Sequence, residues 1–209
     1  MNSLRVLFIC VALITIPVLI ESCCGSCGCN PEWDTSFSIN SMSVAHGTRE
    51  LIPGSSTRYQ TRSTPDITSS PLSKYAMVIS MNVTYHHAFN EHSGGTMAAY
   101  ACSPPVPFSE QMVTSIVITS NQALTNSSGE LSYVAGDDIS AVFSIEDQNG
   151  TVTLIEDFIE KPFYGDSFSL FSELDIDAAQ HHTFTVTITL DDGREFKMTT
   201  KDIELTPKS

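Results

Sequence analysis

The chain has 209 residues, 41% of them hydrophobic, and its 24 acidic against 10 basic residues give a formal net charge of −14. A surface so poor in lysine and arginine repels phosphate backbones, so a nucleic-acid partner is disfavoured. The length suits a single domain that buries its own core without disulfide support.

The first 23 residues have the pattern of a bacterial lipoprotein signal. Arg5 supplies a positive charge, and the apolar segment 6–20 that follows is shorter than the roughly 20 apolar residues of a membrane span. The run Leu19-Ile20-Glu21-Ser22-Cys23 resembles a lipobox, although its acidic residue departs from that pattern. We therefore expect residues 1–22 to be a cleaved signal peptide and Cys23 to carry fatty acyl chains such as palmitate. The alternatives are an ordinary secretory signal cut near the same place, or an uncleaved anchor.

Residues 23–34 would then form a cysteine-rich membrane tether before a single β-sandwich domain at residues 35–209. Several acyl chains hold such a tether on a bilayer, because each buried methylene group contributes about 0.8 kcal/mol. Exported thiols tend to pair in an oxidising compartment, so four cysteines are disulfide candidates with open connectivity. A thiolate Zn²⁺ site is the alternative, although the spacing lacks a second matching pair. The four are Cys24, Cys27, Cys29 and, within the domain, Cys102.

Apolar and polar residues alternate in several segments of the remaining chain, which predicts β-strands. We expect strands at residues 37–44, 77–85, 97–102 and 113–119, the last apolar on both faces as in a central strand. Residues 54–73 are rich in serine, threonine and proline and predict a long surface loop.

Two hairpins are predicted further along the chain. The first spans residues 139–154, with apolar residues alternating on either side of Asn149-Gly150, a strong two-residue turn signal. The second spans residues 183–200 around Asp191-Asp192-Gly193. The alternation changes parity near residues 201–202, so a bulge or a switch of strand is expected there.

Residues 167–180 contain at most a turn or two of helix. Together the segments predict an all-β fold, an immunoglobulin-like antiparallel β-sandwich of roughly eight strands with little helix. Recognition by such a fold is expected in the loops at one end, and residues 85–96 and 103–111 are the segments that we would test first.

His86, His87 and His92 are the most tempting metal ligands, since imidazole binds Zn²⁺ and Cu²⁺ well. Neighbouring residues on a strand point to opposite faces, so His86 and His87 would not serve one site without a distortion. His181 and His182 are a second pair of neighbours. We therefore expect structural histidines and no cofactor, with a periplasmic metal-binding protein as an alternative.

The block Tyr164-Gly165-Asp166-Ser167-Phe168-Ser169 resembles the nucleophile block of GDS-type lipases, which implies Ser167 as a nucleophile. The block departs from that family because it lies late in the chain, and Asp177 and His181 miss the usual Asp-x-x-His spacing. A turn held by glycine and aspartate is the favoured interpretation. We therefore expect no enzyme activity, with an envelope hydrolase as the alternative.

Residues 23–29, 101–104, 116–120 and 136–140 read Cys-Cys-Gly-Ser-Cys-Gly-Cys, Ala-Cys-Ser-Pro, Ile-Val-Ile-Thr-Ser and Gly-Asp-Asp-Ile-Ser, followed by Phe143. This order resembles uncharacterised Bacteroidetes-type lipoproteins, a family without an assigned role. The resemblance implies an exported lipoprotein that is anchored by its lipid, most simply in the outer membrane, and faces the periplasm or the cell surface. We expect a non-catalytic binding or structural module of the cell envelope, with a protein or a glycan as its ligand.

Overall fold

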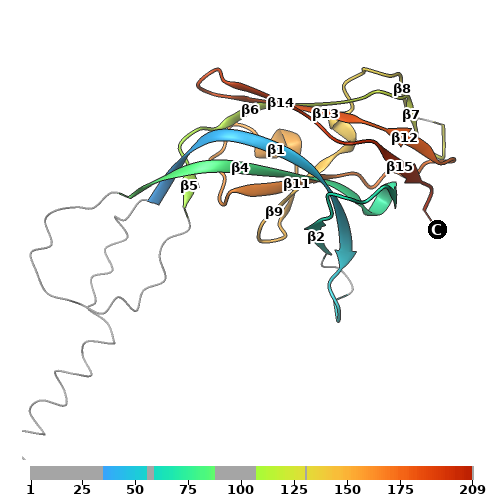
Figure 1. Cartoon of the computed structure of the whole chain (residues 1–209), viewed down its shortest axis with the longest axis horizontal. Coiled ribbons are helices and arrows are strands. Elements are labelled where there is room, and N and C mark those ends of the chain that lie inside the picture. The colour runs from blue at the N-terminus through green and yellow to red at the C-terminus, as the bar shows by residue number, and fades with distance from the viewer. Residues whose placement is uncertain (1–34, 56–58, 88–106, 130, 209) are drawn as a thin grey trace, which may run out of the picture. The chain divides into compact units, whose positions relative to one another are not determined.

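Two β-sheets pack against one hydrophobic core in the computed structural model of the chain (Figure 1). The structure describes residues 35–55, 59–87, 107–129 and 131–208. For these residues the predicted all-β, sandwich-like fold with mostly antiparallel sheets is confirmed. Helical structure in the described ranges is limited to three short segments, which are η1 (Leu72–Lys74), η2 (Ser140–Val142) and α2 (Ile155–Phe158).

The larger sheet has seven strands in the order β10-β9-β11-β4-β1-β2, with β5 paired to β1. Its pairs are antiparallel except the short parallel pair of β1 with β5. The two long strands β1 and β4 lie side by side along most of their length. The strands are β1 (Thr35–Leu51), β2 (Tyr59–Ser63), β4 (Tyr75–His87), β5 (Phe108–Ser109), β9 (Ser144–Asp147), β10 (Val152–Leu154) and β11 (Ser167–Phe171).

The second sheet of the sandwich has the order β14-β13-β6 and lies over β1 and β4 in Figure 1. A further sheet has the order β12-β15-β3, and β7 pairs with β8. These strands are β3 (Ser69–Pro71), β6 (Val113–Ser120), β7 (Leu124–Thr125), β8 (Ser132–Tyr133), β12 (Gln180–His182), β13 (Phe184–Leu190), β14 (Glu195–Thr199) and β15 (Ile203–Thr206).

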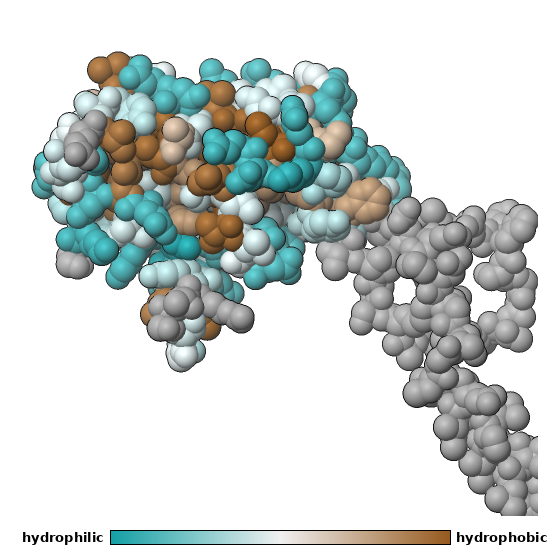
Figure 2. Space-filling view, turned by 180° about the vertical axis from the view of Figure 1, so that it is seen from behind, coloured by the Kyte–Doolittle hydropathy of each residue, from teal (hydrophilic) through white to brown (hydrophobic). Residues whose placement is uncertain are grey.

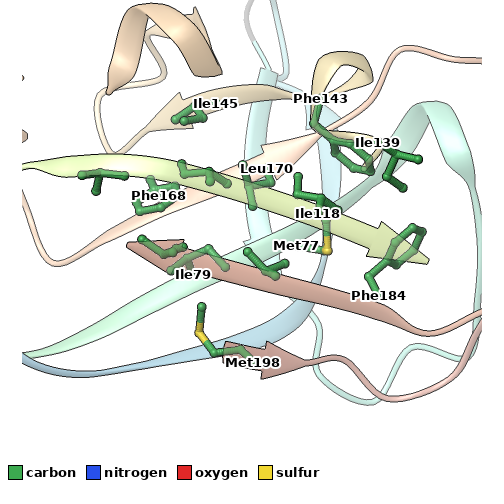
Figure 3. Packing of buried hydrophobic residues seen from close by; sticks show 14 of the residues in the cluster. Met77, Ile79, Ile118, Ile139, Phe143, Ile145, Phe168, Leu170, Phe184 and Met198 are labelled. Atoms are coloured by element: carbon green, nitrogen blue, oxygen red, sulfur yellow. The ribbon is translucent and has the colours of Figure 1, made fainter. Parts of the chain in front are cut away.

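The core lies between the two sheets, and strand alternation determines which side chains enter it. On β13 every second residue is buried, and the threonines between them are half-buried. Figure 3 shows Ile118 and Phe184 of the smaller sheet beside Met77 and Leu170 of the larger one. Each such side chain contributes about 1.5–3 kcal/mol when it is fully buried, so this shared core holds the sandwich together.

The C-terminal hairpin is confirmed. β13 pairs with β14, and Gly193 in the turn between them has a φ of 84°. The predicted change of parity also has its physical cause in the structure, because β15 leaves this sheet and pairs with β12 and β3. A switch of strand therefore carries the chain from one sheet to the next.

The predicted loop at residues 54–73 is wrong in part, because β2 and β3 lie within it. β2 pairs with the end of β1, with Leu51 opposite Tyr59 and Gly47 opposite Ser63. Four of the five residues of β2 are exposed, so the strand shows no apolar alternation. Periodicity detects a strand only when one of its faces is buried, which explains the error.

Strand lengths and positions also differ from the prediction. β1 continues beyond residues 37–44 to Leu51, with a register shift near Asn40. β6 lies at the end of its sheet and is not central, although residues 138–140 bond to its outer edge. There Ile139 N donates to the Ile118 carbonyl oxygen at 2.8 Å.

Two other segments are corrected. The first strand of the hairpin at residues 139–154 is shorter than predicted, since residues 140–142 turn as η2 before β9 begins. The possible helical turns at residues 167–180 are absent from the described structure, in which β11 occupies the start of that segment. Leu170 and Phe171 are buried there as strand residues.

The N-terminal predictions lie outside the described residues, as do all six cysteines, His92 and the strand expected at residues 97–102. Lipidation of Cys23 and disulfides among Cys24, Cys27, Cys29 and Cys102 therefore stay predictions. No helix in the described part of the chain is long and apolar enough to cross a membrane.

Candidate functional site

The described surface is hollowed on the outer face of the larger sheet, where the β1–β2 hairpin lies over β9 and β11. Figure 1 shows β2 turning away from β1 and β4 on the side opposite to β6 and β13. We call this hollow of about 380 Å³ the groove. Its lining consists of Ile52, Tyr59, Gln60, Thr61, Ser63, Val78 and residues 146–150 and 167–169.

Gly47 allows the hairpin to approach the sheet closely. This residue pairs with Ala76 of β4 on one side and with Ser63 of β2 on the other. A Cβ atom at Gly47 would lie 2.7 Å from Val78 Cγ2 and 2.9 Å from the carbonyl oxygen of Arg62. Only a residue without a side chain fits this approach, so Gly47 determines where β2 can lie.

A buried ion pair fixes the hairpin to the sheet. Arg49 of β1 and Glu146 of β9 are 8% and 4% exposed, and Arg49 Nε donates to Glu146 Oε2 at 3.1 Å. The guanidinium lies between two rings, 4.3 Å from the centroid of Tyr59 and 3.6 Å from that of Phe171. Thr61 of β2 donates its hydroxyl to the same carboxylate oxygen at 3.0 Å. These contacts join four strands into the wall of the groove.

Gln148 forms the opposite part of the wall. Its Nε2 donates to Asp166 Oδ1 at 2.7 Å and to Ser167 Oγ at 2.9 Å. Gly165 has a φ of 86°, and a Cβ atom there would collide with the amide of Gln148. The lipase-like block is therefore a glycine turn that leads into β11, which is the interpretation that the sequence favoured.

Among the described residues, Ser167 has no basic partner. Its hydroxyl contacts the side-chain amide of Gln148, which does not accept a proton near neutral pH. The histidines whose side chains are described have other partners: His46 bonds to Tyr75, His86 to Ser38, His181 to Asp202 and His182 to Ser120. The part of the chain that the structure describes therefore gives Ser167 no general base.

The turn between β9 and β10 is longer than the two residues predicted. Asp147 Oδ1 accepts hydrogen bonds from the backbone N–H groups of Asn149 and Thr151, both at 2.8 Å. Gly150 closes the turn with a φ of 77°. The aspartate therefore sets the loop length, and it places Gln148 and Asn149 beside the groove.

The histidines considered as metal ligands are not brought together in the described structure. His86 Nε2 lies 2.9 Å from Ser38 Oγ and 3.8 Å from Glu110 Oε2. His87 follows it on β4, and its side chain is outside the description, like that of His92. His181, on another sheet, pairs with Asp202 at 2.7 Å. No group of three or more His, Cys, Asp or Glu side chains suited to a metal ion occurs among the residues described.

Two histidines lie in the core instead, at the ends of an aromatic stack. His182 stacks on Phe184 with 5.6 Å between ring centroids, Phe184 stacks on Tyr75 at 5.7 Å, and the Tyr75 hydroxyl bonds to His46 Nδ1 at 3.0 Å. The Nε2 atoms of both histidines lack a partner within the described ranges. Burial lowers the pKa of both side chains, and the charge of Lys201 lowers that of His46 further.

No protein-family model, curated protein or solved structure matches this chain. The resemblance to Bacteroidetes-type lipoproteins therefore stays a prediction. Among the residues that build the groove and its wall, Ser167 was a functional candidate from its sequence motif. Arg49, Glu146 and Tyr59 were not predicted. Arg49 and Glu146 are 97 positions apart in the sequence, so no local pattern marks them as a pair.

Proposed function

We propose that the protein is a lipid-anchored, non-catalytic binding module of the bacterial cell envelope, and that the groove is its ligand site. The observation that carries this proposal is the buried pair of Arg49 and Glu146. Burying two charges costs desolvation free energy, and here the pair holds a hairpin over a surface hollow. The volume of about 380 Å³ lies within the range of roughly 300–1,000 Å³ that is typical of ligand sites.

The lining of the groove favours binding over hydrolysis. Within the described chain the lining contains no histidine, and Ser167 contacts an amide where a nucleophile requires a base. The alternative of an envelope hydrolase therefore gains no support from this geometry. The loop at residues 85–96 lies largely outside the described ranges, and the described part of residues 103–111 contains β5, which pairs with β1, so the groove becomes the first surface to test.

Labelled palmitate tests the anchor. In bacteria that process lipoproteins, the label should enter the wild-type protein and the Cys24→Ala variant, and it should be absent from Cys23→Ala. Equal labelling of Cys23→Ala and the wild type would contradict the proposed anchor.

Site-specific photo-crosslinking in intact cells tests the ligand site. A photoreactive residue at Gln60, in the groove, should give an adduct of defined mass. The same residue at Gln122, which is exposed and does not line the groove, is the matched control and should give none. Identical adducts at both positions, or none at Gln60, would contradict a ligand site in the groove.

A further inference from the structure

The groove combines an exposed aromatic ring with polar side chains that have unused hydrogen-bonding groups. From this combination we infer that its ligand is a neutral oligosaccharide. The inference rests on the proposed function, because it names the ligand class of the same groove.

Tyr59 provides a flat apolar surface at the groove. The guanidinium of Arg49 covers one face of its ring, and the residue is still 42% exposed. The C–H face of a pyranose ring packs on such a surface, because both release water when they meet. The cation–π contact holds the ring in one orientation before a ligand arrives, which lowers the entropic cost of binding. Figure 2 shows the hairpin as a projection with hydrophobic surface near its end, where Leu51 and Ile52 are 45% and 36% exposed.

Polar groups surround this surface. The side chains of Gln60, Asn149 and Ser169 line the groove and have no hydrogen-bond partner in the described part of the chain. Amide side chains and hydroxyls can both donate and accept hydrogen bonds. A sugar hydroxyl also donates and accepts hydrogen bonds, so it can pair with any of these three side chains.

The charges of the groove disfavour anionic ligands. Its lining contains Glu146 and Asp147 and, within the described residues, no lysine or arginine. Glu146 is paired with Arg49, and Oδ1 of Asp147 accepts hydrogen bonds from two backbone N–H groups, so the negative charge of Asp147 stays at the groove. An acidic sugar or a phosphate would meet no cationic side chain in this described lining, and it would approach a chain with a net charge of −14. A neutral ligand avoids this repulsion.

A second hollow extends the site beyond one sugar ring. It has a volume of about 190 Å³ and shares Asp147, Ser167 and Phe168 with the groove. Its lining includes Tyr164, which is 55% exposed, and, besides the shared residues, one residue of each charge, Asp157 and Lys161. Each hollow therefore presents one exposed tyrosine, and an oligosaccharide that crosses the shared residues can contact both rings.

Calorimetric titration of the full-length protein tests the inference. The protein is kept in an amine-oxide detergent, because a maltoside detergent carries a sugar that would compete. The neutral probes are maltotetraose, cellotetraose and N-acetylchitotetraose, each compared with its monosaccharide. Tetragalacturonate serves as the acidic probe and tetraalanine as the peptide probe.

At least one neutral tetrasaccharide should bind, more tightly than its monosaccharide and than tetragalacturonate. Tyr59→Ala should weaken this binding by about 5- to 10-fold, whereas Tyr59→Phe keeps the ring and should stay within about 2-fold. Asn149→Ala should also weaken it, and it provides a second test if Tyr59→Ala is poorly folded. Tyr164→Ala should remove the advantage of the tetrasaccharide over the monosaccharide, and Gln122→Ala is the control.

Several outcomes would overturn the inference: no binding of any neutral probe, tighter binding of tetragalacturonate, or binding that is insensitive to both Tyr59→Ala and Asn149→Ala. Binding of tetraalanine alone would also overturn it. If sugars fail but crosslinking at Gln60 succeeds, the ligand class is wrong and the proposed binding site stands. If crosslinking at Gln60 fails as well, the proposed ligand site is wrong too.

Discussion

Removal of Glu146 is the sharpest test of how the groove is built. Arg49 is 8% exposed, and its guanidinium lies between the rings of Tyr59 and Phe171, so Glu146→Ala removes the partner of a buried charge. The nearest remaining carboxylate is that of Glu173, 3.6 Å from Arg49 Nη1. The variant therefore leaves a buried charge without its closest partner.

The expected cost can be worked out from these contacts. Breaking a buried ion pair from one side costs about 3–5 kcal/mol. Glu173 is 80% exposed and compensates only in part, since exposed pairs contribute about 0–1 kcal/mol. We therefore expect Glu146→Ala to lower the free energy of unfolding by about 2–4 kcal/mol, which corresponds to a fall in Tm of roughly 4–16 °C for a domain of this size.

Urea unfolding followed by circular dichroism measures this change, with two variants as references. Glu173→Ala removes the exposed partner of the same arginine and should cost less than about 1 kcal/mol. The double variant Arg49→Met with Glu146→Leu should recover most of the loss, because apolar side chains of similar volume often replace a buried pair at no cost.

A different result would refute this view of the hairpin. If Glu146→Ala costs no more than Glu173→Ala, the pair behaves as a solvated surface contact. The hairpin would then not be fixed over the sheet, and the groove would lack its wall. A double variant as unstable as Glu146→Ala would show that the cost comes from lost packing and not from an unpaired charge.

Two further predictions follow from the same structure. Gly47→Val should lower the free energy of unfolding by about 1–3 kcal/mol and abolish ligand binding, because its side chain collides with Val78 and with β2. Gly54→Ala in the same hairpin strains a backbone with a φ of 85° but meets no atom within 4 Å, so it should keep binding. Burial lowers the pKa of His46 and His182 in the folded state, so below about pH 6.5 these histidines bind protons in the unfolded chain but not in the folded one. The free energy of unfolding should therefore fall with pH, by up to about 1.4 kcal/mol per pH unit for each histidine. The fall ends at the lowered pKa of the folded state. Urea unfolding at pH 7.5, 6.5 and 5.5 measures this, and an unchanged slope in His182→Phe would contradict it. His181→Ala is the control of opposite sign: Asp202 raises the pKa of that exposed residue, so its removal should not make the slope shallower.

Local sequence pattern was sufficient for most of the core. The alternation on β13, the turn at Gly193 and the parity change before β15 each depend on residues that are neighbours in the chain. On a strand with one buried face, apolar residues recur at every second position, so the sequence of the strand itself indicates which side chains are buried. For this reason the all-β fold and the C-terminal hairpin were predicted correctly.

The groove depends on contacts that no local pattern records. β2 is exposed on both faces, so its sequence shows no apolar alternation. A glycine is required at position 47 because two neighbouring strands approach it closely. Arg49 meets Glu146 only after the sheet has folded. Ser167, a candidate from its sequence motif, also acquires its partner Gln148 from a remote segment, the turn between β9 and β10. Local periodicity therefore determined which residues are buried, whereas the tertiary structure decided which exposed and charged residues meet, because the distance between remote segments is set by the packing of the whole sandwich.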